Sequence, residues 1–258
     1  RAAPRPMTRL RLVSRRIGAA GAASSDGVLP EGARFLSESH GSGAGRRDYK
    51  LYVPGRSRGR RMPLIVMLHG CTQSPDDFAA GTRMNAFAEQ LGCLVAYPAQ
   101  SQAANPQKCW NWFNPADQRR DQGEAGAIAG ITRQITRDHA VDPRRVYVAG
   151  LSAGGAAAAI LGNAYPDLYA AIGVHSGLAC GAAHDLRSAL AAMRRGAPVP
   201  RRVSVPVPAE GRRILPTIVF HADRDSTVHP RNGDQVIIQA GAADARTAAG
   251  LRAEVQRG

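Results

Sequence analysis

Ser152 lies at the centre of the motif Gly150-Leu151-Ser152-Ala153-Gly154, with a glycine two residues away on each side. The apolar run Val146–Ala149 precedes the motif and the apolar run Ala156–Leu161 follows it. This order predicts a strand, a sharp turn and a helix, which together hold a serine hydroxyl above a sheet edge and aim helix N–H groups at it. The pattern therefore favours a nucleophilic serine over a structural Gly-Ser turn.

Nucleophilic serines need a base that takes the proton and an acid that orients the base. Where the nucleophile lies on such a turn, the acid follows the serine along the chain and the histidine follows the acid. Asp225 is the predicted acid because it comes just after the apolar run 214–221 and precedes a Ser-Thr-Val turn; Asp223 is the alternative. The predicted oxyanion donors are the backbone N–H groups of Ala153 and Cys71.

Apolar runs of strand length alternate with helical segments along most of the chain. The predicted strands cover residues 49–53, 64–68, 93–97, 146–149, 169–174 and 214–221, and the predicted helices cover 76–90, 123–139, 156–161, 183–193 and 231–240. Such alternation predicts an α/β fold with a mostly parallel sheet and helices on both faces. Ligands bind at the carboxyl ends of parallel strands, and every candidate for chemistry follows a predicted strand.

A long predicted loop, residues 99–118, carries both tryptophans of the chain, Trp110 and Trp112. Aromatic surface beside a strand end is typical of a cleft wall. The alternative is a loop that fills the core, and the sequence favours neither. His175, which follows another predicted strand, is the third candidate cleft residue.

Four cysteines show no spacing typical of metal ligands, so no metal site is predicted. Cys71 and Cys109 both lie in loops that follow strands, and a disulfide between them is possible. Cys93 lies within an apolar strand and is predicted to be a buried thiol.

The net charge of +14 is concentrated at the beginning of the chain, where residues 1–61 hold 14 Lys and Arg against 4 Asp and Glu. A basic arm of this kind can bind nucleic acid, but it carries no interleaved aromatic residues for base stacking. We therefore predict that residues 1–33 are a disordered, solvated arm without a nucleic-acid partner. Residues 34–258 form one predicted domain, and no apolar run approaches the ~18 residues of a membrane span.

Four stretches of the chain resemble the polyhydroxybutyrate (PHB) depolymerase family of esterases, which is related to the feruloyl and acetylxylan esterases. They are LHGCTQSPDDFAAGTRMN, AYPAQ…ANPQKCWNWF, VYVAGLSAGG and HSGLACGAA. The resemblance runs from about residue 34 to residue 239. It implies an α/β-hydrolase fold and hydrolysis of small or polymeric carboxylic esters through an acyl-serine intermediate. It also implies no metal or organic cofactor, often an extracellular location, and Ser152 and Asp225 as nucleophile and acid.

The catalytic histidine of this family follows the acid by several dozen residues, beyond one more strand. Only 33 residues follow Asp225 here, and the single histidine among them, His229, matches a non-catalytic position. We therefore expect the base to be absent from this sequence and the esterase domain to be incomplete at its C-terminus. Two other functions stay open: a binding protein that retains the fold without the base, and a peptidase of the same fold.

Overall fold

The structure is a computed structural model that describes residues 29–42, 45–55, 59–197 and 215–241. Residues 1–28 of the predicted arm lie outside the described residues. So do residues 242–258, where the sequence predicts an incomplete domain, and residue 214, where the last predicted strand begins.

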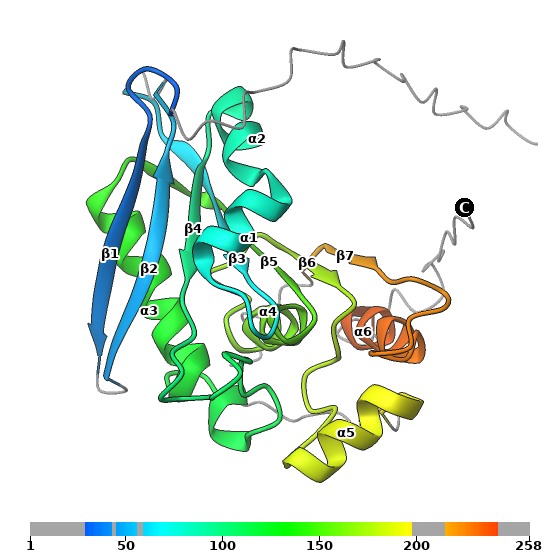
Figure 1. Ribbon diagram of the computed structural model, residues 1–258. Helices are drawn as coiled ribbons and strands as arrows, with labels where there is room; N and C mark the ends of the chain where they lie inside the picture. Colours follow the sequence, from blue (N-terminus) through cyan, green and yellow to red (C-terminus); the bar gives the residue numbers. More distant parts are fainter. Residues whose placement is uncertain (1–28, 43–44, 56–58, 198–214, 242–258) are drawn as a thin grey trace, which may run out of the picture.

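A seven-stranded sheet runs through the centre of the described residues (Figure 1). β1 and β2 pair antiparallel at one side, β2 pairs antiparallel with β4, and the strands from β4 to β7 are parallel. The predicted mostly parallel sheet is therefore confirmed. In spatial order the strands are β1 (Arg34–Ser42), β2 (Gly45–Val53), β4 (Leu94–Pro98), β3 (Met62–Leu68), β5 (Val141–Leu151), β6 (Ala171–His175) and β7 (Thr217–Phe220).

β1 was not predicted, because its sequence RFLSESHGS has only two adjacent apolar residues and no alternating pattern. Its strand conformation depends on pairing with β2 along its whole length, from Arg34 opposite Val53 to Ser42 opposite Gly45. Tertiary pairing thus decides a conformation that local sequence leaves open.

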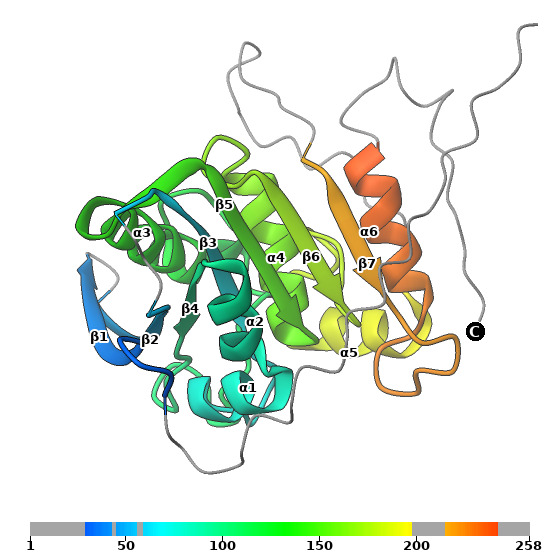
Figure 2. The ribbon, with the colours of Figure 1, turned by 90° about the horizontal axis from the view of Figure 1, so that it is seen from above.

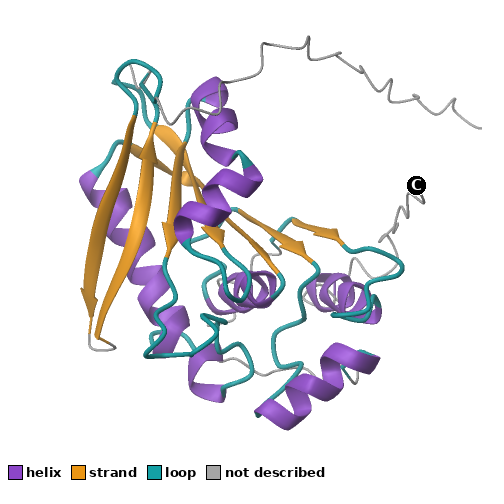
Figure 3. Cartoon of the chain, in the orientation of Figure 1, coloured by secondary structure: helices purple, strands orange, loops and turns teal. Residues whose placement is uncertain are grey.

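Helices cover both faces of the sheet, as Figures 2 and 3 show. α1 and α2 lie on one face and α3, α4 and α6 on the other, while α5 packs against α6 as an outer layer. The bounds are α1 (Pro75–Thr82), α2 (Met84–Leu91), α3 (Gly123–Asp138), α4 (Ala153–Ala164), α5 (Leu186–Arg195) and α6 (Arg231–Gly241), with a short 3₁₀ helix η1 (Pro115–Gln118).

The predicted single helix over 76–90 is wrong, because the chain breaks there into α1 and α2. Arg83 adopts the left-handed conformation with φ 53°, and its N–H donates to the carbonyl of Ala80. Gly81 and Thr82, just before the break, are weak helix formers, so little propensity opposes it. α1 begins with a capping box in which Ser74 accepts from the N–H of Asp77.

Two apolar clusters fill the spaces on either side of the sheet. The larger one contains Val146 and Val148 of β5 together with the alanines of α4, which lies against β3, β5 and β6. Almost all residues of α4 are buried, which explains why its sequence is apolar on every side. The smaller cluster lies beneath α1 and α2 and includes Phe78 and Tyr97.

β7 pairs with β6 alone among the described strands. Its side chains Ile218 and Phe220 are 55% and 56% exposed. An open strand edge with apolar side chains favours association with other chains.

Candidate active site

Ser152 occupies the sharp turn between β5 and α4, as the motif predicts. Its φ of 55° and ψ of −116° are strained for a residue with a side chain, and it is the N-cap of α4. Any side chain at Gly150 would place its Cβ 2.2 Å from the carbonyl oxygen of Gly154, and a Cβ at Gly154 would lie 2.1 Å from that of Leu68. Both glycines are thus required by close backbone contacts.

The loop after β3, residues 69–72, lies beside this turn, because Gly154 packs directly against the end of β3. The N–H of Gly70 donates to the side chain of Gln73 at 2.8 Å, and that of Thr72 donates to the carbonyl of Gln107 at 2.6 Å. Between them, the N–H of Cys71 donates to no group in the described part of the chain. A free N–H between two fixed neighbours is what an oxyanion donor requires.

Asp225 lies in the loop that follows β7, with its side chain 15% exposed. One carboxylate oxygen, Oδ1, accepts the backbone N–H groups of Thr227 and Val228, both at 2.9 Å. The alternative acid, Asp223, is exposed on the same loop. The structure therefore gives Asp225, and not Asp223, the fixed orientation that an acid needs.

Burial of Asp225 alone would raise its pKa, but hydrogen bonds outweigh that cost and hold the pKa below its ordinary value. The donors are the N–H groups of Val228 and Thr227 and the side chain of Ser176. Because these bonds favour the charged form, Asp225 is a carboxylate at neutral pH.

The end of β6 links the serine turn to the end of β7, where the loop that carries Asp225 begins. The N–H of Ser152 donates to the carbonyl of His175 at 2.9 Å, and the N–H of the next residue, Ser176, donates to Phe220 at 2.8 Å. The candidate cleft residue His175 thus contacts the site through its backbone. Its ring is exposed and stacks on Phe220, with 6.3 Å between ring centroids.

His221 contacts the predicted acid and was not anticipated from the sequence. Its Nε2 lies 3.6 Å from Oδ2 of Asp225 and 2.7 Å from the carbonyl of Val228. A carbonyl oxygen only accepts, so Nε2 carries a proton and donates a hydrogen bond to the carbonyl of Val228. The spacing of four residues to Asp225 was the available signal, but a histidine before the acid lies on the wrong side of the expected order.

Neither His221 nor His229 reaches the serine, since no ring in the described part of the chain bonds to the Ser152 hydroxyl. His229 instead lies at the start of α6, where its N–H donates to Met193 and its Nδ1 accepts from Arg231.

Cys71 and Cys109 form a disulfide, which confirms the pairing that the sequence left open. Cys93 is a buried free thiol, as predicted, and burial raises its pKa to about 11. The disulfide ties the loop after β3 to the loop that carries the tryptophans.

Trp110 fits the core-filling alternative and not the cleft wall, because it is completely buried. Its indole N–H donates to the carbonyl of His69 at 3.0 Å, which places it beneath the loop after β3. Trp112 is 6% exposed and meets Phe113 edge to face. The aromatic loop therefore packs against the buried side of the loop after β3.

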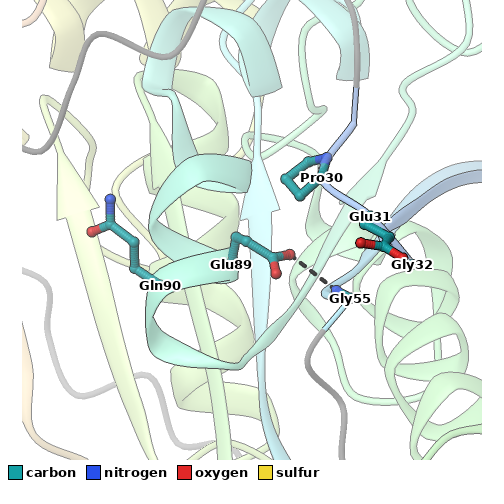
Figure 4. A pocket seen from close by; sticks show the side chains of 6 residues that line it. All are labelled: Pro30, Glu31, Gly32, Gly55, Glu89 and Gln90. Carbon is teal, nitrogen blue, oxygen red and sulfur yellow. Dashed lines mark hydrogen bonds between the residues drawn. The ribbon is translucent and has the colours of Figure 1, made fainter.

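In the described residues, no group of three or more His, Cys, Asp or Glu side chains is arranged to hold a metal ion. The pocket drawn in Figure 4 has a volume of about 580 Å³ and is lined by Pro30, Glu31, Gly32, Gly55, Glu89 and Gln90. It lies where β2 and α2 end, which is at the amino-terminal ends of the parallel strands. Ser152 lies at their carboxyl ends.

Fold and site together define an α/β hydrolase: a mostly parallel sheet, a strained serine between a strand and a helix, and a fixed carboxylate after a later strand. A solved acetyl xylan esterase from Aspergillus awamori has the same fold, with a TM-score of 0.65 at 20% identity over 78% of this chain and 75% of that chain. The family model described as "Esterase PHB depolymerase" matches residues 47–257, and the chain belongs to that family.

Two curated proteins are similar to the chain in sequence. Poly(3-hydroxyalkanoate) depolymerase C of Paucimonas lemoignei is 34% identical over 182 residues, which cover 69% of this chain and 44% of the relative. Feruloyl esterase B of Thermothelomyces thermophilus is 34% identical over 140 residues, which cover 54% of this chain and 47% of the relative. The chain thus spans less than half the length of each.

Proposed function

We propose that the protein hydrolyses carboxylic esters through an acyl-serine intermediate, with Ser152 as nucleophile and Asp225 as the acid that orients a base. The observation that carries this proposal is the strained turn at Ser152, which lies beside the free N–H of Cys71 and is linked through the end of β6 to the loop of a fixed, charged Asp225. The N–H groups of Cys71 and Ala153 stabilise the oxyanion of the tetrahedral intermediate. No step of this chemistry requires a cofactor.

The proposed substrates are polyhydroxyalkanoates or related short-chain esters. Family membership and the 182-residue match to a poly(3-hydroxyalkanoate) depolymerase support this class. Feruloyl and acetylxylan esters are the alternative, supported by the match to a feruloyl esterase. We propose an extracellular location on the same family grounds; none of the described helices is long and apolar enough to cross a membrane.

Covalent labelling combined with turnover tests the proposal. In a chain that includes the catalytic base, a fluorophosphonate should label the protein at Ser152, and Ser152→Ala should lose both the label and the hydrolysis of p-nitrophenyl butyrate. Ser37→Ala is the control: Ser37 is exposed on the edge strand β1, and this variant should keep the label. Labelling that survives in Ser152→Ala would remove Ser152 as the nucleophile.

A further inference from the structure

Glu124 is a buried carboxylate in the first turn of α3, with 6% exposure and no part in the steps above. Burial raises the pKa of Glu124, while hydrogen bonds from Gln100 and from the N–H of Asn111 act in the opposite direction. Among the described residues it forms no ion pair. A buried charge without an ion pair is costly, so its hydrogen bonds must offset the loss of water.

The partners of its carboxylate all lie in the loop after β4. The side-chain amide of Gln100 donates to Oε1, the N–H of Asn111 donates to Oε2 at 2.7 Å, and Nδ2 of Asn111 donates to Oε1 at 2.8 Å. Both carboxylate oxygens are therefore in use, and they hold together two points of the loop that are eleven residues apart.

From Gln100, one route of contacts leads to the loop after β3. The backbone N–H of Gln100 donates to Nε2 of His69 at 3.2 Å, and Nδ1 of His69 donates to the carbonyl of Gly70 at 2.7 Å. The His69 ring is thus fixed as the neutral tautomer with its proton on Nδ1. It connects the anchored loop directly to the peptide bond that carries the N–H of Cys71.

A second route starts at Cys109, whose carbonyl accepts from the side-chain amide of Gln100 at 2.9 Å. Cys109 is bonded covalently to Cys71. The next residue, Trp110, donates to the carbonyl of His69, and Asn111 beside it bonds to Glu124. Both routes therefore lead from one carboxylate to residues 69–71.

We propose that Glu124 is a positioning residue, which fixes the N–H of Cys71 as an oxyanion donor through Gln100 and His69 on one route and through the Cys109–Cys71 disulfide on the other. This inference rests on the proposed function in one respect, namely that the N–H of Cys71 acts on the reaction. The connection itself depends only on the contacts.

Glu124→Gln tests the proposal, because an amide has one acceptor oxygen where the carboxylate has two. Its NH₂ group must face a donor from Gln100 or Asn111, so at least one bond is lost. Glu89→Gln is the matched control. Glu89 is partly buried and accepts from the Tyr52 hydroxyl and the Gly55 N–H. It lies at the amino-terminal ends of the parallel strands, away from Ser152.

Oxyanion contacts strengthen in the transition state, so displacement of one donor lowers kcat more than it changes KM. For p-nitrophenyl butyrate we expect Glu124→Gln to lower kcat by about 10- to 100-fold, somewhat less than loss of a whole donor. KM should stay within about twofold. Glu89→Gln should leave both values unchanged. A kcat per folded molecule equal to that of the wild type would overturn the proposal.

A spectroscopic measurement separates this inference from the proposed function. The chain has only two tryptophans, so ¹⁵N-tryptophan labelling gives two indole N–H signals, assigned with Trp112→Phe. Glu124→Gln should shift the Trp110 signal and accelerate its exchange with water, while Glu89→Gln should do neither. Should a chain that includes the catalytic base hydrolyse no ester, the proposed function fails, and the Trp110 signal still decides whether Glu124 holds the loop.

Asn111→Ala serves if Glu124→Gln does not fold, since it removes one bond to the carboxylate and leaves the carboxylate bound to Gln100. It also removes the side-chain bonds of Asn111 to Asn105 and Ala104. It should change kcat and the Trp110 signal in the same direction but to a smaller extent. An unchanged Trp110 signal in this folded variant contradicts the proposed connection.

Discussion

Nε2 of His221 lies 3.6 Å from the carboxylate of Asp225, yet its N–H donates a hydrogen bond to the carbonyl oxygen of Val228. This bond joins the two ends of the acid loop. Because Val228 also donates its N–H to Oδ1 of Asp225, the ring, the backbone and the acid form one closed arrangement. Among the described residues, no backbone N–H donates to Oδ2 of Asp225, so this is the oxygen that we expect to face a base.

Replacing His221 with a residue that cannot donate a hydrogen bond to Val228 should therefore loosen the acid loop. We expect His221→Leu to lower kcat, because Asp225 loses its fixed orientation, and to lower the free energy of unfolding by about 1–3 kcal/mol, because the carbonyl of Val228 loses its donor. His221→Gln can still donate from Nε2 and should recover most of both losses. His229→Ala is the control. It should leave kcat unchanged, and a loss of turnover there would identify His229 as the base.

Exchanging the two aspartates for asparagine tests the choice of acid. In a chain that includes the catalytic base, Asp225→Asn should lower kcat by roughly 10³–10⁴, because the base loses the partner that orients it. Asp223→Asn should change kcat far less, since Asp223 is exposed and the N–H groups of the loop bond to Asp225. The reverse order of effects in steady-state kinetics would transfer the role to Asp223.

Much of this arrangement could be predicted from sequence, and what was missed has a physical cause. Short-range patterns placed Ser152 in a sharp turn between a strand and a helix and Asp225 in a loop after a strand, and the structure has both placements. Glycines at fixed spacing mark the turn, and an apolar run marks the strand before Asp225. His221, Gln100 and Glu124 could not be found in this way. Their roles depend on partners that the fold brings together, such as Glu124 with Gln100, 24 residues apart in the chain. The break at Arg83 was missed because apolar residues continue on both sides of it.

Trp110 should contribute to stability more than to substrate binding. Trp110→Phe removes the indole N–H that bonds to the buried carbonyl of His69, and an unsatisfied buried acceptor costs about 1–3 kcal/mol. Denaturant unfolding of Trp110→Phe and Trp112→Phe should show the larger loss for Trp110, because the Trp112 indole N–H bonds to none of the described residues. If Trp110→Phe raised KM for bulky esters and left the stability unchanged, Trp110 would be part of the cleft wall instead.

His69 should make the stability of the fold depend on pH. Burial is the main cause that holds its pKa below the usual 6.5; nearby Lys108 adds to this, and the Gly70 carbonyl and Asp77 oppose it. As the pH falls below about 6.5, the unfolded chain takes up a proton that the folded chain refuses, so the free energy of unfolding decreases.

The decrease continues until the pH reaches the lowered pKa of the folded state, with a slope of at most about 1.4 kcal/mol per pH unit for one proton. Glutamine can donate and accept hydrogen bonds but does not titrate in this range. The difference in unfolding free energy between the wild type and His69→Gln should therefore shrink or reverse between about pH 7 and pH 5. Denaturant titrations at several pH values measure it. A difference that stays constant over that range would mean that His69 binds protons equally well in both states, which the buried ring and its acceptor role toward Gln100 contradict.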